Sequence, residues 1–162
     1  MKIITPPHKI GAKKVEDPKL IIQEAIKIQE AITNGEVFYP GSKWQECFAV
    51  AHQQVSTDPL RYFVLNPEWK LGVKAFEGEI IVNPKLISKD RMTRIMFAEG
   101  CLSWPYKPPK KVKRFRQIVV SYVIINNKGR IKTITNKSLE ELPAIVFQHE
   151  LDHLNAKTIW DK

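Results

Sequence analysis

Two histidines near the end of the sequence have the spacing of a metal-binding hydrolase motif. The segment AIVFQHELDHLNAK places His149, Glu150 and His153 in the pattern HExxH. Residues four apart share one face of a helix, so both imidazoles can bind one metal ion with a carboxylate beside it. A catalytic metal usually takes three protein ligands and a water. The motif therefore predicts a metal-dependent hydrolase and requires a third ligand elsewhere in the chain.

The third ligand is expected upstream of this motif. Only nine residues follow His153, and the one acid among them, Asp161, lies on a short tail. In the extended pattern HExxHxxGxxH, the glycine would fall on Ala156 and the third histidine on Ile159. Ile159 cannot supply a ligand. The upstream candidates comprise carboxylates and four other side chains: His8, Cys47, His52 and Cys101.

Cys101 is one of these candidates. It stands in the segment EGCLSWP, where Gly100 permits close approach of the backbone and Pro105 ends regular structure. A thiolate is a strong, soft ligand once a metal lowers its pKa. The alternative is that a free cysteine is a small buried hydrophobic residue. The residues alone leave both interpretations open.

Length and composition fit one globular domain over residues 1–162. Of the residues, 43% are hydrophobic and 27% are charged, and a chain of this size can bury a substantial core. No apolar run approaches the ~20 residues that span a bilayer, and the first residues lack the apolar region of a secretory signal. Two cysteines do not make a disulfide framework. Together these observations predict a cytoplasmic protein without a membrane partner.

The elements that must position these side chains predict an α+β fold. Residues 18–34 have helical periodicity, with Pro18 in the first turn and Gly35 at the end. The expected apolar stripe of this helix consists of Leu20, Ile21, Ala25, Ile28 and Ile32. Strand patterns are present at residues 61–66, 78–84, 117–125 and 130–136.

The final helix is expected to begin near Leu142 and to be apolar on nearly every side. It carries the HExxH motif. Buried histidines and a buried carboxylate need partners, and a bound cation would supply them.

Much of the net charge of +9 lies in the segment YKPPKKVKRFR, residues 106–116. The simplest interpretation is a solvated loop and strand edge. The alternative is an electrostatic surface for an anionic substrate terminus or for RNA.

The segments EGCLSWP and QHELDHL resemble two motifs of the peptide deformylases, EGCLS and QHExDH. A third motif of that family, GxGxAAxQ, is matched in degraded form by CFAVAHQQV. Cys47 and Ala49 stand at the glycines, His52 stands at the second alanine, and Gln54 stands at the glutamine. The resemblance extends from about residue 47 to residue 160, and the short end resembles compact, phage-type members. It implies antiparallel sheets around a central HExxH helix, with an N-terminal helix.

The resemblance also implies a role for each matched residue. Three ligands of a divalent metal are implied: Cys101, His149 and His153. The metal would be Fe²⁺, with Zn²⁺, Ni²⁺ or Co²⁺ able to substitute. Glu150 would accept a proton from the attacking water and deliver it to the departing amine. The side-chain amide of Gln54 and the backbone N–H of Leu102 would donate to the oxyanion. Gln53 is the competing amide.

The implied reaction is hydrolysis of the formyl group from N-formylmethionyl peptides of nascent proteins, with release of formate. A monomer that transiently encounters the ribosome is expected. The alternatives are another HExxH metallo-hydrolase and a catalytically impaired, deformylase-like basic binding protein.

Further expectations concern the surroundings of the site. Gln148 could order the loop of Cys101, Glu99 and Arg114 could form a buried ion pair, and Asp152 could orient a ligand imidazole. A pocket for the methionine side chain is expected from Phe48, Leu142, Ile145 and Val146. Lys107 or Lys110 could hold the peptide backbone.

Overall fold

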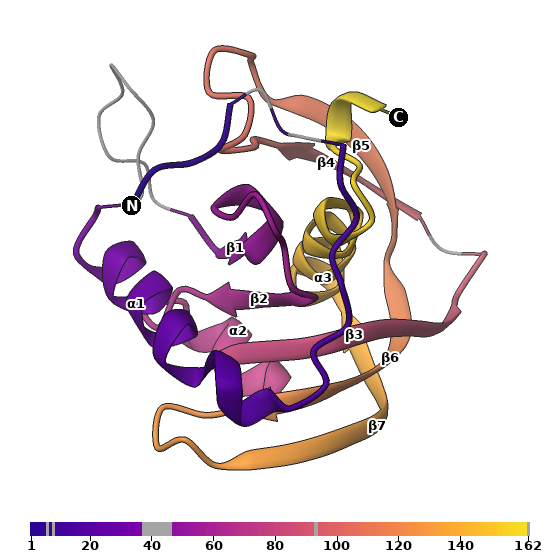
Figure 1. Cartoon of the computed structure of the whole chain (residues 1–162). Coiled ribbons are helices and arrows are strands. Elements are labelled where there is room, and N and C mark those ends of the chain that lie inside the picture. Colours follow the sequence, from indigo (N-terminus) through magenta and orange to yellow (C-terminus); the bar gives the residue numbers. More distant parts are fainter. Residues whose placement is uncertain (6, 8, 37–46, 93, 162) are drawn as a thin grey trace.

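The computed structural model describes residues 1–5, 7, 9–36, 47–92 and 94–161 as helices packed on two antiparallel sheets (Figure 1). The α-helices are α1 (Ile22–Thr33), α2 (Lys70–Phe76) and α3 (Glu141–Leu154), and the short 3-10 helices are η1 (Pro18–Ile21), η2 (His52–Gln54) and η3 (Ile159–Asp161). The strands are β1 (Ala49–Ala51), β2 (Tyr62–Leu65), β3 (Ile80–Lys89), β4 (Arg94–Glu99), β5 (Lys110–Phe115), β6 (Gln117–Ile125) and β7 (Ile131–Glu140).

The larger sheet has the strand order β1-β2-β3-β6-β7, and every neighbouring pair is antiparallel. Strand β3 runs past Pro84 to Lys89, five residues beyond the predicted end of this segment. Its pairing with β6 shifts register between Val82 and Lys85, where Asn83 has a φ of 50°. This irregularity lets the strand accommodate a proline that lacks the N–H of a regular ladder.

The larger sheet is buried on both faces at its β1–β3 end. Ala49, Ala51 and Phe63 point to the side that packs against α2 and α3. Val50 and Tyr62 point to the opposite side, which packs against α1. This alternation follows from the period of two along a strand, and it explains why these strands read as continuous apolar runs. The α+β architecture with antiparallel sheets, an N-terminal helix and the HExxH helix is as predicted.

The N-terminal helix begins with a 3-10 turn, and this turn changes its apolar face. Asp17 caps the turn by accepting a hydrogen bond from Lys19 N–H at 2.9 Å. Ile21 and the later stripe residues are buried, whereas Leu20 is 82% exposed, so the prediction for Leu20 was wrong. The tighter winding of the 3-10 turn rotates Leu20 away from the face that continues along α1. Gly35 ends the helix region with a φ of 68°, as expected.

The two-stranded sheet β4–β5 lies on the other side of α3 from the larger sheet (Figure 1). Its strands, together with β1 and α2, were not among the predicted elements. Helix α3 begins at Glu141, one residue before the predicted start, with Pro143 in its first turn, where a missing N–H costs little.

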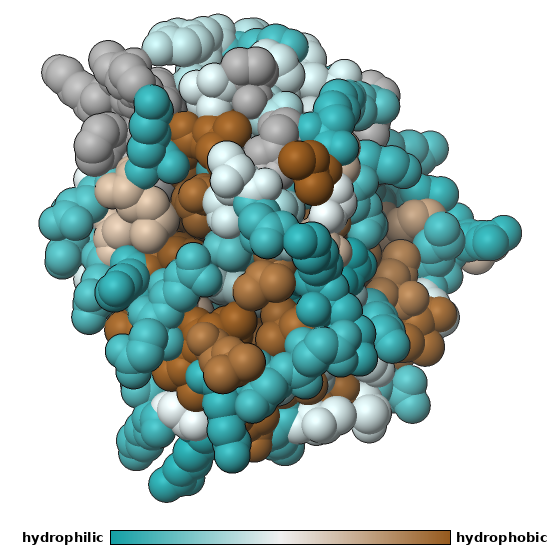
Figure 2. All heavy atoms as spheres, viewed as in Figure 1, coloured by the Kyte–Doolittle hydropathy of each residue, from teal (hydrophilic) through white to brown (hydrophobic). Residues whose placement is uncertain are grey.

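Figure 2 shows hydrophilic side chains over most of one face, with hydrophobic patches between them. Within the described ranges, no helix is long and apolar enough to cross a membrane.

Candidate metal centre and active site

Three side chains from two elements bring their ligand atoms together. Cys101 lies two residues after the end of β4, and His149 and His153 lie one turn apart on α3. The Cys101 Sγ is 3.3 Å from His153 Nε2, which is 3.3 Å from His149 Nε2. All three ligand atoms lie within 4.8 Å of one another. Metal–ligand lengths of about 2.0–2.3 Å at tetrahedral angles put ligand atoms about 3.3–3.6 Å apart. The observed spacing therefore fits one tetrahedrally bound divalent cation.

A buried carboxylate fixes the orientation of one imidazole. Glu99 Oε2 accepts from His149 Nδ1 at 2.7 Å, which leaves Nε2 as the nitrogen that faces Cys101. Both oxygens of Glu99 also accept from Arg114, each at 2.7 Å. The guanidinium is 1% exposed, and it donates further to Asp152 at 2.6 Å.

The predicted ion pair of Glu99 and Arg114 is therefore buried. The prediction for Asp152 was wrong, because the carboxylate that orients a ligand imidazole is that of Glu99. A carboxylate behind a metal-binding histidine sets its tautomer and increases its basicity.

Charges within this cluster shift several pKa values. Burial opposes ionisation of Glu99, but its hydrogen bonds with Arg114 and His149 outweigh burial and lower the pKa of Glu99. Burial also opposes charge on His149, and its bonds with Cys101 and Glu99 outweigh that effect and raise its pKa to about 10. Burial and the neighbouring His149 lower the pKa of His153 well below its usual value. These shifts favour one positive charge, on His149, for the two imidazoles together.

Glu150 is buried at the same site, with a relative exposure of 4%. Burial is the main reason that its pKa is raised to about 7. Among the described residues, Glu150 Oε2 and His153 Nδ1 are buried without a hydrogen-bond partner. Buried polar atoms of this kind are costly unless a ligand or water satisfies them. The carboxylate is therefore available to exchange a proton with a molecule bound in the adjoining pocket.

A pocket of about 220 Å³ opens onto the cluster. Its lining includes Cys47, Phe48, Gln54, Phe97, Gly100, Cys101, Leu102, Leu142, Ile145, Val146, His149 and Glu150. The four apolar residues predicted to form a pocket all line it. Gly100 was expected to permit close approach of the backbone. That expectation was wrong, because a Cβ added at Gly100 would meet no atom within 4 Å.

Gln54 reaches this pocket from η2 and is held at both ends of its amide. Its Oε1 accepts from Ala51 N–H at 2.9 Å, and its Nε2 donates to Ser103 Oγ at 3.2 Å. Ser103 was missed as a site residue, although the serine of EGCLS marks it. Leu102 also lines the pocket, and among the described residues no hydrogen bond engages its N–H. Two donors, one side chain and one backbone, therefore lie beside the candidate metal centre.

Gln53 also belongs to η2, but it lies away from this pocket. Its side chain is buried, and its Nε2 donates to the backbone oxygen of Ile10 at 3.4 Å.

His52 is a buried structural side chain and does not belong to the metal cluster. Its Nδ1 accepts from Leu60 N–H at 2.9 Å, so the ring proton is on Nε2, which contacts Glu24 at 3.1 Å. The ring stacks on Tyr62 with centroids 4.6 Å apart. Cys47 lines the pocket but does not join the ligand group. His8, another candidate, lies outside the described residues.

Two other expectations need correction. Gln148 does not bridge to the loop of Cys101, because its amide bonds Phe115 N–H and Phe115 O on β5. Lys107 and Lys110 do not line the pocket. Lys107 Nζ lies over the rings of Trp104 and Trp160, and Lys110 Nζ donates to Ile159 O at 2.9 Å. The two lysines therefore join the loop after Cys101 to residues near the end of the chain.

Comparison with known sequences gives this arrangement its family. The sequence model of the polypeptide deformylases matches residues 2–162. The chain belongs to the polypeptide deformylase family. A peptide deformylase of Helicobacter acinonychis is 37% identical over 107 residues, which are 64% of this chain and 55% of that protein. The chain spans about half the length of the curated deformylases it matches.

Solved deformylase structures share the fold over nearly the whole chain. Peptide deformylase 1B of Arabidopsis thaliana superposes with a TM-score of 0.72 at 25% identity, covering 99% of this chain and 80% of the plant chain. A probable peptide deformylase from Synechococcus phage S-SSM7 superposes with a TM-score of 0.69 at 27% identity. That match covers 98% of this chain and 97% of the phage chain. The deformylase family and fold expected from the motifs are thus confirmed.

Proposed function

We propose that this chain is a metal-dependent peptide deformylase that removes the formyl group from N-formylmethionyl peptides and releases formate. The observation that carries the proposal is the convergence of Cys101, His149 and His153 at one end of a pocket that also holds Glu150. A thiolate and two imidazoles match the soft and intermediate ligands of Fe²⁺ and Zn²⁺. The native metal is proposed to be Fe²⁺, with Zn²⁺, Ni²⁺ or Co²⁺ as substitutes.

Each neighbouring residue has a role in this proposal. The bound cation would lower the pKa of a water from about 15.7 to about 7 and so supply hydroxide at neutral pH. Glu150 would accept a proton from the attacking water and would deliver it to the departing amine nitrogen. The amide of Gln54 and the N–H of Leu102 donate to the oxyanion that forms when the formyl carbon is attacked. Such donors commonly contribute ~10²–10³ to turnover.

The pocket lining supports a substrate with an apolar first side chain. Phe48, Leu142, Ile145 and Val146 present aromatic and aliphatic groups beside the polar end of the pocket. An unbranched thioether side chain packs well against such surfaces. The formyl amide of the same residue would then lie at the candidate metal centre, beside the side-chain amide of Gln54 and the N–H of Leu102. The substrate is therefore proposed to be a peptide that begins with N-formylmethionine.

Formate release from formyl-Met-Ala-Ser tests the proposal. We expect anaerobically purified protein to contain about one divalent metal ion per chain and to release formate. The matched control is the variant Glu150→Gln, which should retain the metal and lose about 10²–10⁴-fold in turnover. A second control is acetyl-Met-Ala-Ser, because its acyl carbon carries a methyl group where formyl has hydrogen. Protein that holds its metal but leaves the formyl peptide intact would overturn the proposal and favour another metallo-hydrolase.

The proposed function also implies a cellular location, an oligomeric state and an interaction partner. Formylated N-termini arise on nascent chains, so the protein is proposed to act as a monomer in the cytoplasm and to meet the ribosome transiently. Sedimentation of the purified protein tests the monomer. Deformylation of stalled ribosome–nascent-chain complexes tests the encounter.

A further inference from the structure

The positive charge of this protein is concentrated in one fifth of its sequence. Residues 85–117 hold ten lysines and arginines but only two acids, so they carry +8 of the formal net charge of +9. The rest of the chain holds 16 basic and 15 acidic residues. A balanced chain with one strongly basic segment differs from a chain that is basic throughout, because the segment creates a local field. This segment contains the whole of the two-stranded sheet β4–β5.

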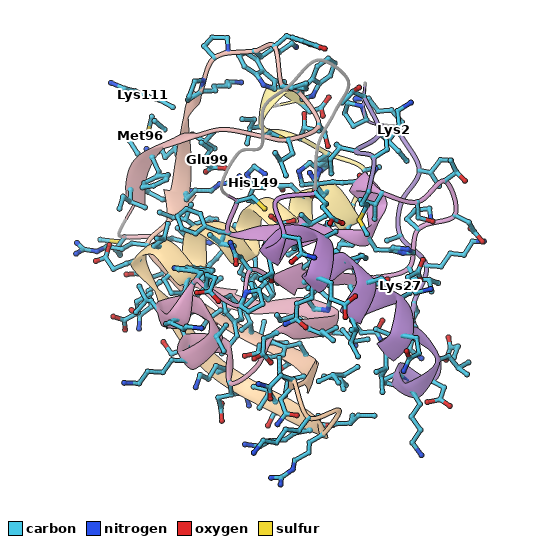
Figure 3. The ribbon with its side chains drawn as sticks, turned by 90° about the vertical axis from the view of Figure 1, so that its left-hand side faces the viewer. Lys2, Lys27, Met96, Glu99, Lys111 and His149 are labelled. Carbon is cyan, nitrogen blue, oxygen red and sulfur yellow. The ribbon has the colours of Figure 1, made fainter. Side chains whose placement is uncertain are left out.

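The two faces of the β4–β5 ribbon differ in whether their charges are paired and buried or exposed. On the inner face, Glu99 and Arg114 neutralise each other next to His149. On the outer face, Arg94, Lys111 and Lys113 are exposed. Figure 3 shows Lys111 and Met96 on the outer side of the ribbon, with Glu99 directed inward to His149. The ribbon therefore separates a neutral, buried face from a cationic, exposed one.

The outer cations have no acidic neighbour across the ribbon. The strand register places Lys111 opposite Ala98 and Lys113 opposite Met96, while Arg94 lies 3.6 Å above the Phe115 ring opposite it. Among the described residues, none of these three cations forms an ion pair, although exposed lysines elsewhere do. Exposed Lys132, for example, shares Glu77 with the partly buried Lys137. Like charges held close on one strand face repel each other, so an anionic partner would stabilise this surface.

The shape of the surface indicates an extended polyanion. Lys111 and Lys113 are two residues apart on one strand face, which corresponds to about 6.8 Å between their Cα atoms. Arg94, Lys111 and Lys113 do not line the substrate pocket, although Phe97, Ala98 and Glu99 of the same ribbon do. A regularly spaced row of cations on a stiff two-stranded ribbon fits a partner with repeated negative charges. Nucleic-acid grooves accept ribbons of this kind.

We propose that the outer face of β4–β5 is a binding surface for the phosphate backbone of a nucleic acid. Binding is electrostatic and independent of base sequence, with Arg94, Lys111 and Lys113 each contacting a phosphate. Arg94 stays ordered for this contact because its guanidinium stacks on Phe115, and a stacked guanidinium can still donate in its plane. The surface does not need the hydrolytic activity, so either proposal can fail without the other.

Fluorescence anisotropy with labelled RNA and DNA tests this surface. The probes are a single-stranded RNA of about 20 nucleotides and a DNA duplex of equal length, titrated between about 50 mM and 200 mM salt. The test variant is the triple substitution R94Q/K111Q/K113Q. The control is K27Q/K74Q/K128Q, which removes three exposed cations from other elements and leaves the same net charge. Figure 3 shows Lys27 on α1, far from Lys111.

The expected results separate local from overall charge. The ribbon variant should bind at least about tenfold more weakly, and its slope of log K against log salt should fall by about 2 for RNA or 2.7 for DNA. The control has the same net charge as the ribbon variant, but it should bind within about twofold of the unchanged protein, because its three substituted lysines lie outside the ribbon. The tighter of the two probes identifies the nucleic acid. Equal loss in both variants, no binding at low salt, or binding to phosphatidylserine vesicles alone would overturn the proposal.

Fold and activity are measured in parallel. Both triple variants should keep the melting temperature of the unchanged protein within a few degrees, since surface substitutions cost little. Both should also keep whatever formate release the unchanged protein shows, because none of the six residues lines the pocket.

Discussion

Removal of Arg114 should damage this protein far more than removal of any exposed arginine. The Arg114 guanidinium is 1% exposed and holds both oxygens of Glu99, which is itself 5% exposed. The substitution Arg114→Met keeps most of the stem volume and removes the charge. Glu99 would then remain buried as an anion with only His149 beside it, whereas Asp152 is partly exposed and can be solvated.

The general energetics of buried ion pairs give the magnitude. Breaking such a pair by removing one partner costs about 3–5 kcal/mol, because an uncompensated charge stays buried. In a domain of this size, each kcal/mol lowers the melting temperature by about 2–4 °C. We therefore expect Arg114→Met to melt about 6–20 °C below the unchanged protein. Metal affinity should also fall about 10–100-fold, because Glu99 would no longer orient His149 correctly.

Thermal and urea unfolding of three variants checks this reasoning. The control is Arg116→Met, since Arg116 pairs with Glu141 on the surface, where such pairs contribute no more than about 1 kcal/mol. The double variant Glu99→Gln/Arg114→Met removes both charges of the pair and should recover more than about 2 kcal/mol of the loss. A cost below about 1 kcal/mol for Arg114→Met, or a double variant no more stable than the single, would refute the role given to this pair.

Three further predictions concern the site and its support. Cys101→Ala should abolish binding of the metal while circular dichroism shows a folded protein; full metal content in this variant would contradict the ligand set. Gln54→Leu should keep the metal but lower turnover by about 10²–10³, measured as formate release at saturating peptide. Burial lowers the pKa of His52, so the unfolded chain binds more protons just below pH 6.5 and stability should fall as the pH falls through that range. Urea unfolding at several pH values should show this loss in the unchanged protein, and the loss should be smaller in a His52→Asn variant, in which His153 still keeps its lowered pKa.

The relative positions of the two motif histidines could be predicted from the HExxH spacing, because they depend only on local helix geometry. Residues four apart on a helix must share a face, so the positions of His149 and His153 follow once α3 forms. Cys101 is different, since it lies about 50 residues away and reaches α3 only through the pairing of β4 with β5. No rule of spacing gives that contact. Only the resemblance of its surrounding segment to a known motif singled it out.

Strand β5 escaped prediction because its alternation is one of charge and not of hydropathy. In β5 the exposed positions hold Lys111 and Lys113, and the buried positions hold Val112 and Arg114. A buried arginine looks like a surface residue until its partner Glu99 is known. The wrong prediction for Asp152 has a similar cause. Asp152 is next to a ligand in sequence, whereas the carboxylate that contacts His149 comes from another element. A buried charge pair places charged residues at buried strand positions, so the alternation of apolar and polar residues that predicts a strand is lost.

The degraded first motif is the strongest reason to doubt activity, and the contacts of His52 answer it. His52 stands where the family has a small alanine, so a larger ring had to be accommodated in η2. The ring is anchored on Glu24 of α1, the Leu60 N–H and the face of Tyr62. These contacts hold η2 against the sheet, and two residues later Gln54 still reaches the pocket.

Ala49 likewise fits the altered motif, because its methyl group belongs to the packed core beneath α3. Gln54 thus lines the pocket with these altered residues beside it. The hydrolase proposed above needs a donor at that position, so the altered motif is compatible with the proposed activity.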